Sequence, residues 1–252
     1  MSEADKTRLE GVTIVWTGSK DAATSLLGAL EDVGATVERL PLIEFGPPED
    51  ELEVEQMFSN IDRFSWILFT SARAADGVAG LPSPAARVAA VGPATRRRLL
   101  EQGWRVDLTP EQNDANGLAD ALSEELPVER PVLFVRGDRA RRALPDRLIA
   151  MGVSVEEVVV YATRPVGQRR AEDAVRRIVD SADAVIMGSP SGVETLIGAT
   201  KPGALGELKP GLKWFCLGGA TREALKTAGI QEVAFPKKTT PKQLVEIFFR
   251  AF

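Results

Sequence analysis

The side chains that could carry chemistry in this chain are hydroxyls, arginines and carboxylates, because histidine is absent and Cys216 is the only cysteine. Without histidine and a second cysteine, neither a Ser-His-Asp triad nor a Cys-His pair can form, and a zinc site of His and Cys ligands is excluded. The D-x-D-x-D-G spacing of an oxygen-ligand calcium loop is also missing. Sites built from carboxylates alone stay open, and the chemistry must otherwise use Tyr, Ser, Thr, Lys, Arg, Asp, Glu or the backbone.

Six short segments rich in Gly, Ser, Thr and Ala each follow an apolar run and precede a stretch of helical length. Small residues there let a bound carboxylate reach the N–H groups of the first helical turn, where the helix dipole also favours negative charge. Several such sites would suit a polyacid, and the alternative is that these residues only cap helices. The candidate binding residues are Thr17, Gly18, Ser19, Lys20, Ser71, Ala72, Arg73, Gly92, Pro93, Ala94, Arg136, Gly137, Ser189, Ser191, Gly192, Gly218, Gly219, Ala220 and Thr221.

Arginine is most concentrated directly after the apolar run 132–135, at Arg136, Arg139, Arg141 and Arg142. Guanidinium groups bind carboxylates in bidentate geometry, so this cluster predicts further contacts to an acidic ligand. Arg136 lies nearest the end of the run and is the member that we assign to the ligand site. The alternative is a solvated helix face whose arginines pair with neighbouring acids.

Two hydroxyl groups are candidates for a direct part in a reaction. Tyr161 is the only tyrosine, and its phenol can donate a hydrogen bond or a proton to a departing hydroxyl. Thr95 is a second candidate for a polar contact. Tyrosine in a β-prone run is also a common packing residue and threonine at a helix start is a common cap, so both interpretations stay open for each residue.

These residues must be positioned by alternating strands and helices, because short apolar runs alternate with amphipathic stretches along the whole chain. This rhythm predicts an α/β fold of parallel sheets flanked by helices, with ligands at the carboxyl ends of the strands. The predicted strands are 12–16, 66–70, 88–91, 132–135, 184–187, 214–217 and 233–235. The predicted helices are 21–33, 94–102, 117–125, 139–151, 169–181, 220–228 and 241–251. Glycines predicted as left-handed helix ends are Gly34, Gly103, Gly152 and Gly229.

The chain also repeats itself, which indicates a duplication and two similar lobes. Residues that match 126 positions apart (218 − 92) are Gly92 and Gly218, Gly103 and Gly229, and Pro110 and Pro236. Residues that match 118 positions apart (152 − 34) are Gly34 and Gly152, Leu30 and Leu148, Val37 and Val155, and Ser71 and Ser189. Taken alone, the repeat places a domain boundary near residue 128.

Two β-prone stretches interrupt the alternation of strands and helices. They span 37–45 and 155–163, and each ends near a proline, at Pro47 or Pro165. Both are too long for a strand-to-helix loop, and they occupy equivalent places in the two repeats. We expect extended connectors that cross between the lobes.

Length and composition favour two ordinary domains, since 252 residues with 44% hydrophobic content are enough for two cores. The net charge of −5 provides no overall basic field, which argues against nucleic acid or an anionic membrane surface as a partner. No apolar run approaches the roughly 20 residues of a membrane span, and the first residues show no signal-peptide pattern. With its single cysteine, the chain is predicted to be cytoplasmic.

Four stretches give the chain a resemblance to the uroporphyrinogen-III synthase family. They are WILFTSA at 66–72, VGPAT at 91–95, VVVYAT at 158–163 and GSPSGV at 188–193. Each motif is weak by itself, but their order and spacing, with the overall alternation, extend the resemblance over essentially the whole chain.

The resemblance implies a topology that differs from a simple division between repeats. One lobe would contain 1–38 and 166–252, the other 46–156, and the segments 39–45 and 157–165 would form a two-stranded β connector beside a cleft. One position departs from the family pattern, because Lys20 follows the first strand where relatives often carry an arginine.

The resemblance also implies a reaction, the cofactor-free cyclisation of hydroxymethylbilane with inversion of its last pyrrole ring. Tyr161 would then be a catalytic residue, with Thr95 as a second candidate, and the substrate would be a linear tetrapyrrole. A monomer is expected, with a transient contact to the upstream deaminase that forms the bilane.

Two other classes of function stay open on the sequence. One is a non-catalytic ligand-binding or regulatory paralogue on the same two-lobed scaffold. The other is an unrelated two-lobed binding protein or a glycosyltransferase-like enzyme. A nucleotide enzyme is not supported, because the chain has neither the G-x-G-x-x-G nor the G-x-x-x-x-G-K-[ST] phosphate loop.

Overall fold

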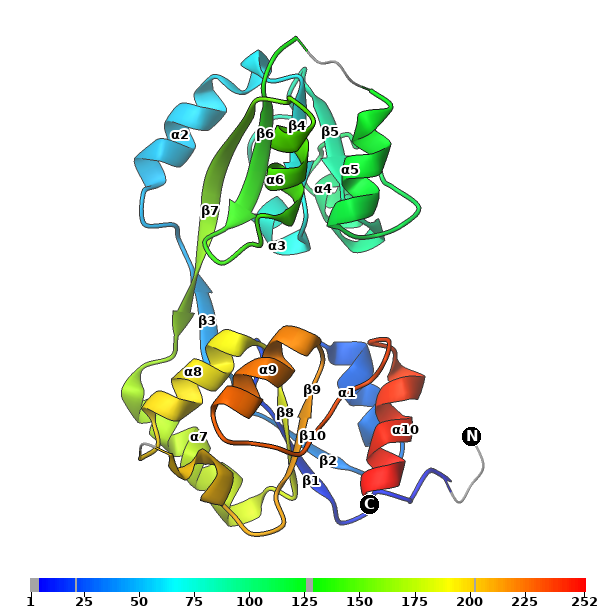
Figure 1. Cartoon of the computed structure of the whole chain (residues 1–252), viewed down its shortest axis with the longest axis vertical. Helices are drawn as coiled ribbons and strands as arrows, with labels where there is room; N and C mark the ends of the chain where they lie inside the picture. The colour runs from blue at the N-terminus through cyan, green and yellow to red at the C-terminus, as the bar shows by residue number, and fades with distance from the viewer. Residues whose placement is uncertain (1–4, 21, 126–128, 202) are drawn as a thin grey trace. The chain divides into compact units, whose positions relative to one another are not determined.

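The computed structural model describes residues 5–20, 22–125, 129–201 and 203–252, and the chain divides into two compact units (Figure 1). Unit 1 consists of Met1–Glu44 and Arg164–Phe252, and unit 2 of Phe45–Thr163. Both boundaries fall inside the predicted connectors 39–45 and 157–165. Residue 128, where the repeat alone places a boundary, lies outside the described residues, and the segments on either side of it belong to the same unit.

Unit 1 is built on a five-stranded sheet whose adjacent strands are all parallel. In spatial order its strands are β10 (Val233–Ala234), β9 (Lys213–Cys216), β8 (Ala184–Met187), β1 (Thr13–Trp16) and β2 (Thr36–Arg39). One face is covered by α7 (Gln168–Ser181), α8 (Pro190–Gly198) and α9 (Gly219–Thr227). The other face is covered by α1 (Thr24–Glu31) and α10 (Pro241–Ala251). A short 3-10 turn, η3, spans Ala204–Glu207.

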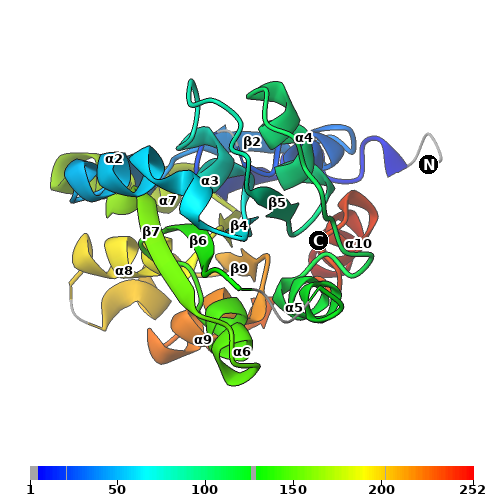
Figure 2. The same cartoon turned by 90° about the horizontal axis from the view of Figure 1, so that it is seen from above.

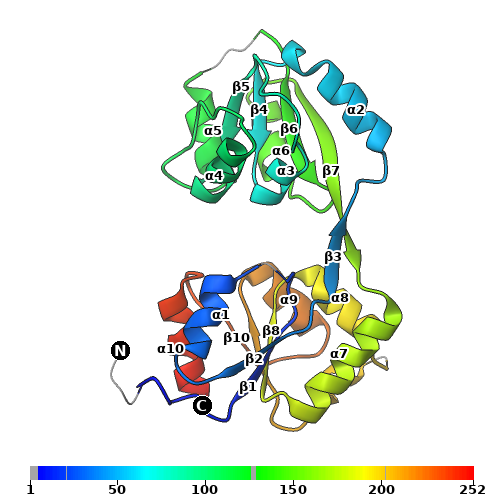
Figure 3. The same cartoon turned by 180° about the vertical axis from the view of Figure 1, so that it is seen from behind.

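Unit 2 has the same three layers, which Figure 2 shows with its sheet between two sets of helices. In spatial order its strands are β3 (Ile43–Gly46), β7 (Val155–Pro165), β6 (Val132–Gly137), β4 (Trp66–Phe69) and β5 (Arg87–Ala90). One face carries α2 (Glu51–Ser59), α3 (Ala72–Asp76) and α4 (Pro93–Glu101), with the 3-10 turn η2 (Ile61–Arg63). The other face carries α5 (Ala115–Ser123) and α6 (Ala143–Ala150). The long strand β7 runs alongside β3 (Figure 3).

Strand pairing shows how the duplication is arranged in space. Thr13 pairs with Thr36 between β1 and β2, and Val132 pairs with Val155 between β6 and β7, so both members of the second pair lie 119 positions later (132 − 13, 155 − 36). The pair Ala89 and Leu108 recurs 126 positions later as Phe215 and Ala234 (215 − 89, 234 − 108). The two units therefore share one spatial order of strands, but the equivalent strands follow one another in a different order along the chain.

Most predicted elements are confirmed to within a few residues, and all four predicted glycine helix ends have positive φ, between 80° and 96°. The stretch 37–45 crosses between the units as expected, and it does so as two strands, since β2 belongs to the sheet of unit 1 and β3 to that of unit 2. The predicted helix 139–151 begins only at Ala143, since the N–H of Ala140 first closes a turn on the carbonyl of Gly137. Asp21, where another helix was predicted to start, lies outside the described residues.

The helix α2 was missed, because it buries none of its side chains fully. Stretches of helical length were expected after the small-residue segments at 71 and 189, and they correspond to α3, which is only five residues long, and α8. The described ranges contain no helix that is both long and apolar enough to cross a membrane.

Candidate functional site

The predicted binding residues gather at the carboxyl edges of the two sheets, because adjacent parallel strands all end on the same side. In unit 1 they follow β1, β8 and β9, and in unit 2 they follow β4 and β5 or lie at the end of β6. Each unit therefore has a candidate edge of its own.

Two of the helices that start at these edges are already capped. The hydroxyl of Ser71 accepts a hydrogen bond from the N–H of Ala74 at 3.1 Å, and Ser189 accepts one from Gly192 at 3.1 Å. Capping by serine satisfies one of the free donors of the first turn. For Ser71 and Ser189, the capping alternative therefore describes what the side chains do.

The helices α4 and α9 begin differently, because Gly92 and Gly218 stand at their N-caps and provide no side-chain acceptor. Pro93 has no N–H, but the next residues of α4 and the first residues of α9 present backbone donors without a side-chain cap. Pro93, Ala94, Gly219 and Ala220 are all exposed. The space beside Gly218 is open, with no atom within 4 Å of a side-chain carbon there, whereas the Asn113 side chain lies beside Gly92.

Three threonines are the buried polar residues of the described part of the chain, and all three lie at these edges. Thr17 is used internally, since its hydroxyl lies 3.1 Å from the carbonyl oxygen of Ile186 and 3.3 Å from the sulfur of Met187. Thr95 and Thr221 occupy equivalent third positions in α4 and α9 and are 4% and 5% exposed. Neither hydroxyl forms a hydrogen bond to another described residue, so both are free to meet a ligand.

The loop after β1 is shaped by Trp16 rather than left open. The indole of Trp16 covers Gly18 so closely that no side chain would fit at that position, and its N–H donates to the carbonyl of Ser19 at 3.1 Å. A side-chain carbon at Gly188 would in turn lie 2.7 Å from the Cα of Gly18. Lys20 is exposed and has no acidic partner among the described residues, which leaves its ammonium group available.

Arg136 makes its contacts within unit 2. Its Nε lies 2.7 Å from Oε2 of Glu157, and its Nη1 donates to the carbonyl oxygens of Gly137 at 3.0 Å and Asp138 at 3.2 Å. The same Glu157 carboxylate binds Arg142 and raises the pKa of that guanidinium. The alternative interpretation of the arginine cluster, pairing with neighbouring acids, thus describes these two members.

Tyr161 lies near the end of β7 in an aromatic and cationic group. Its ring meets the Phe45 ring edge to face, with centroids 5.6 Å apart, and the guanidinium of Arg73 lies 3.8 Å from the Phe45 centroid. The Tyr161 side chain is half-buried, and its hydroxyl forms no hydrogen bond to a described residue. Arg73 has no carboxylate partner among those residues either, so a free phenol and a free cation both contact Phe45.

Sequence reasoning missed Phe45, Asp138 and Glu157 as members of this group. Phe45 closes an apolar run and has the pattern of a packing residue, while Glu157 belongs to β7 and reaches Arg136 only because β6 and β7 are neighbours. Asp138 could have been flagged, since it directly follows Gly137 in a segment already singled out. Its contacts depend on the sheet register, which the sequence does not reveal.

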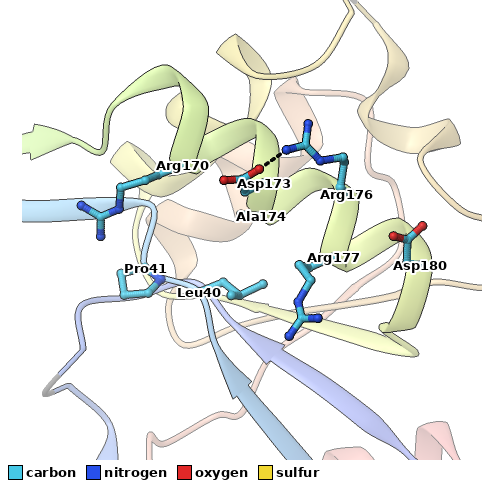
Figure 4. Close-up of a pocket in the computed structure, with 8 residues that line it drawn as sticks. All are labelled: Leu40, Pro41, Arg170, Asp173, Ala174, Arg176, Arg177 and Asp180. Atoms are coloured by element: carbon cyan, nitrogen blue, oxygen red, sulfur yellow. Dashed lines mark hydrogen bonds and ion pairs between the residues drawn. The ribbon is translucent and has the colours of Figure 1, made fainter.

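A hollow of unit 1 lies away from these edges (Figure 4). About 520 Å³ in volume, it lies between the Leu40–Pro41 segment and α7. Its arginines are neutralised by nearby acids: Arg170 by Glu44 at 3.0 Å, Arg177 by Glu38 at 3.5 Å, and Arg176 by Asp173. A second hollow, about 490 Å³, lies between the segments 206–214 and 229–232. Neither contains a predicted site residue, so we assign the site to the sheet edges instead.

Potential metal ligands do not gather in the part of the chain that the structure describes, where no group of three or more His, Cys, Asp or Glu side chains could hold an ion. The chemistry available at the edges is hydrogen bonding from one phenol and two threonine hydroxyls, with cations and backbone N–H groups that attract anions. This combination fits a small molecule that carries several carboxylates.

Comparisons with known proteins agree with this chemistry. The family model described as uroporphyrinogen-III synthase HemD matches residues 24–246. A protein of Methanothermobacter thermautotrophicus that carries the provisional name uroporphyrinogen-III synthase is 30% identical over 228 residues, 86% of this chain and 89% of its own length. The uroporphyrinogen-III synthase of Synechococcus elongatus is 28% identical over 166 residues, 62% of each chain.

Solved structures show the same fold. The uroporphyrinogen-III synthetase of Helicobacter pylori matches with a TM-score of 0.65 at 16% identity, over 96% of this chain and all of its own. A mutant uroporphyrinogen III synthase of Thermus thermophilus matches with a TM-score of 0.58 at 19% identity, over 95% of this chain and 98% of its own. Sequence and fold agree, and this chain belongs to the uroporphyrinogen-III synthase family.

Proposed function

We propose that the chain cyclises hydroxymethylbilane to uroporphyrinogen III, and that Tyr161 assists the departure of the substrate hydroxyl. Family membership supports the reaction, which belongs to the lyase class and to tetrapyrrole biosynthesis. The observation that carries the role of Tyr161 is its half-buried phenol, which has no hydrogen-bond partner among the described residues and lies beside Phe45.

The first step is the loss of water from the hydroxymethyl group. The carbon–oxygen bond breaks as the pyrrole nitrogen donates its electron pair, and the leaving hydroxyl takes up a proton, which gives an azafulvene and water. A phenol that donates a hydrogen bond or proton to that oxygen stabilises the developing negative charge. Tyr161 has the chemical group for this step, and neither histidine nor a metal is needed for it.

The second stage decides which isomer forms. The last pyrrole ring attacks the azafulvene carbon through its own substituted carbon, which gives a spiro intermediate. The bond from that carbon to the methylene of the neighbouring ring then breaks, and the unsubstituted α carbon of the last ring bonds to this methylene and loses a proton, which closes the macrocycle with the ring inverted. Holding the substrate in this crowded geometry is a task of positioning, which contributes by restricting motion before the bonds change. We therefore assign most of the binding residues to the substrate's acetate and propionate groups.

The helix starts of α4 and α9 are the strongest candidates for these carboxylates. Each combines an N-cap glycine, uncapped backbone donors and a buried threonine hydroxyl, Thr95 or Thr221. Arg73 and Lys20 are two cations at these edges that have no acidic partner among the described residues. Ser19, Ser191 and the capped Ser71 and Ser189 complete the proposal as weaker contacts.

We further infer a monomeric, cytoplasmic enzyme that works without a cofactor. Hydroxymethylbilane closes spontaneously to the type I isomer, so a transient contact with the deaminase that supplies it would shorten its exposure to water. The acidic net charge of −5 supports neither nucleic acid nor an anionic membrane as a partner.

The decisive experiment supplies freshly made hydroxymethylbilane and measures the ratio of type III to type I product. We expect mainly type III from the wild-type protein. A product that is only type I would contradict the synthase activity and leave a ligand-binding role.

Tyr161→Phe removes one hydroxyl from the proposed site and keeps the ring that contacts Phe45. We expect its kcat for type III product to fall by about a hundredfold, the usual scale for a general acid, with an unchanged far-ultraviolet circular dichroism spectrum and a similar melting temperature. Unchanged turnover would remove Tyr161 from the mechanism.

A further inference from the structure

The position of the Tyr161 ring is set by Gly137 on the neighbouring strand. A side-chain carbon at position 137 would lie 2.6 Å from Cε2 and 2.7 Å from the hydroxyl oxygen of Tyr161, closer than real carbon atoms approach. The ring can occupy its place only because residue 137 has no side chain. Gly137 thus lies under the phenol, and its absent side chain determines where the hydroxyl is.

A β-bulge brings Tyr161 opposite Gly137. Along β6 and β7, Arg136 pairs with Val159 but the next residue, Gly137, pairs with Tyr161, so Val160 is the extra residue of the bulge. Val160 is 6% exposed and packs in the core of unit 2. Bulges of this kind redirect the side chains that follow them. Without the bulge, Val160 would stand opposite Gly137 and Tyr161 would be shifted by one residue.

Asp138 holds the backbone at Tyr161 and directly after it. Its N–H donates to the carbonyl oxygen of Tyr161 at 3.1 Å, and its carboxylate accepts a hydrogen bond from the N–H of Thr163 at 2.9 Å. These two contacts continue the pairing of the strands beyond the bulge. Arg136 fixes the same turn from the other side by donating to the carbonyls of residues 137 and 138.

We propose that Gly137 and Asp138 are positioning residues for Tyr161, and that they do not themselves take part in the reaction. The inference rests on the proposed function, because it assumes that the phenol acts on the substrate. It also changes the interpretation of Gly137, which sequence reasoning assigned to substrate binding. Gly137 provides the space for the ring, and Asp138 holds residues 161–163 in register.

The test uses Tyr161 as its own probe, since the chain contains one tyrosine. Protein labelled with 3-fluorotyrosine has a single fluorine NMR position whose shift and width report the surroundings of the Tyr161 ring. The variants are Gly137→Ala, Asp138→Ala and Asp138→Asn, and kcat and KM for type III product are measured for each with unlabelled protein.

The conservative variant separates positioning from chemistry. Asparagine keeps an uncharged oxygen that can accept the hydrogen bond from Thr163, whereas it can act neither as a base nor as a charged ligand for substrate. We expect Asp138→Ala to move or broaden the fluorine signal and to lower kcat by about ten- to a hundredfold, with KM changed less than about twofold. In Asp138→Asn the fluorine signal and kcat should both return to their wild-type values. Gly137→Ala should reproduce the alanine result although it keeps Asp138.

Two matched controls lie outside this group. Asp62 is an exposed aspartate of unit 2 whose carboxylate accepts a backbone hydrogen bond from Ala85 at 2.8 Å, so Asp62→Ala removes the same kind of contact. At Gly198 the space that a side-chain carbon would take has no atom within 4 Å, and the backbone geometry is ordinary, so Gly198→Ala adds the same methyl group without a clash. Both should leave the fluorine signal and kcat unchanged.

Failure of this inference differs from failure of the proposed function. A fluorine signal that stays in place in Gly137→Ala and Asp138→Ala would overturn the positioning role, as would an Asp138→Asn enzyme as slow as Asp138→Ala. Full turnover by Tyr161→Phe would instead overturn the phenol's part in the reaction. If Asp138→Ala does not fold, the signal and kcat of Gly137→Ala decide the question.

Discussion

The two units share their strand order and their helix starts, yet they differ at the ends of two equivalent strands, β1 and β6. In both units one helix is capped by a serine, Ser71 or Ser189, and another begins at an uncapped glycine, Gly92 or Gly218. The duplicated part of the fold thus presents the same kind of uncapped helix start twice.

The difference lies at Thr17-Gly18 in unit 1 and Arg136-Gly137 in unit 2, which stand 119 positions apart (136 − 17). Gly18 is covered by Trp16 of its own strand, and the Thr17 hydroxyl is used inside the unit. Gly137 instead lies under Tyr161 from the neighbouring strand. The two units therefore share the helix starts that we propose for substrate carboxylates, whereas the tyrosine beside the equivalent glycine occurs in unit 2 alone.

The largest effect on KM is expected when a carboxylate is introduced at one of the uncapped helix starts that the two units share. In Gly218→Asp the new side chain can accept from the first-turn N–H groups of α9, since no atom lies within 4 Å of its Cβ position. The aspartate would occupy the site proposed for a substrate carboxylate and would repel that carboxylate, so we expect KM to rise more than about tenfold. The helix itself should gain about a few tenths of a kcal/mol. Steady-state kinetics and thermal unfolding check both expectations.

Gly218→Ala is the matched control, because it adds a carbon but no acceptor. Its KM should stay within about twofold of wild type. If Gly218→Asp also keeps the wild-type KM, the start of α9 binds no substrate carboxylate. The likeness between the helix starts of α4 and α9 would then be structural and not functional.

A smaller effect is expected at Arg73, a cation of unit 2 that has no acidic partner among the described residues. Arg73→Ala should raise KM by about tenfold, the scale of one charge-assisted hydrogen bond, and should weaken the salt dependence of KM. Arg98→Ala is the control, because Arg98 on the neighbouring helix is already paired with Asp76 and Glu101, whose hydrogen bonds raise its pKa. Equal losses in the two variants would argue for general charge rather than a specific contact. KM measured between low and high salt distinguishes these outcomes.

The smallest effect concerns Cys216, which lies fully buried in unit 1. Burial raises the pKa of its thiol, so the neutral form persists to higher pH than in an unfolded chain. Its contribution to stability is present below the ordinary thiol pKa and is lost as pH rises through the raised value. We expect a thiol reagent at about pH 8, near the ordinary thiol pKa, to react only as unit 1 unfolds in urea, while Tyr161 absorbance reports on unit 2. Rapid reaction in the native protein would contradict this burial.

Much of each unit follows from local sequence. The central strands are short apolar runs, and the glycines at 34, 103, 152 and 229 end helices because left-handed backbone is easiest without a side chain. The site was harder to predict. Ser71 and Ser189 proved to be caps, and Arg136 proved to be paired with Glu157, because such contacts depend on local backbone geometry and on neighbours distant in the chain.

The sequence by itself determined the α/β alternation, the repeat, the absence of histidine chemistry and the single tyrosine, since these depend on residue type and short-range spacing. The family resemblance, rather than any local pattern, assigned strands β1 and β2 to the C-terminal part, and the folded structure alone showed that Phe45, Gly137 and Asp138 surround Tyr161. The physical reason is that strand order and register arise from pairing between distant segments. A bulge of one residue is enough to choose which side chain faces Gly137.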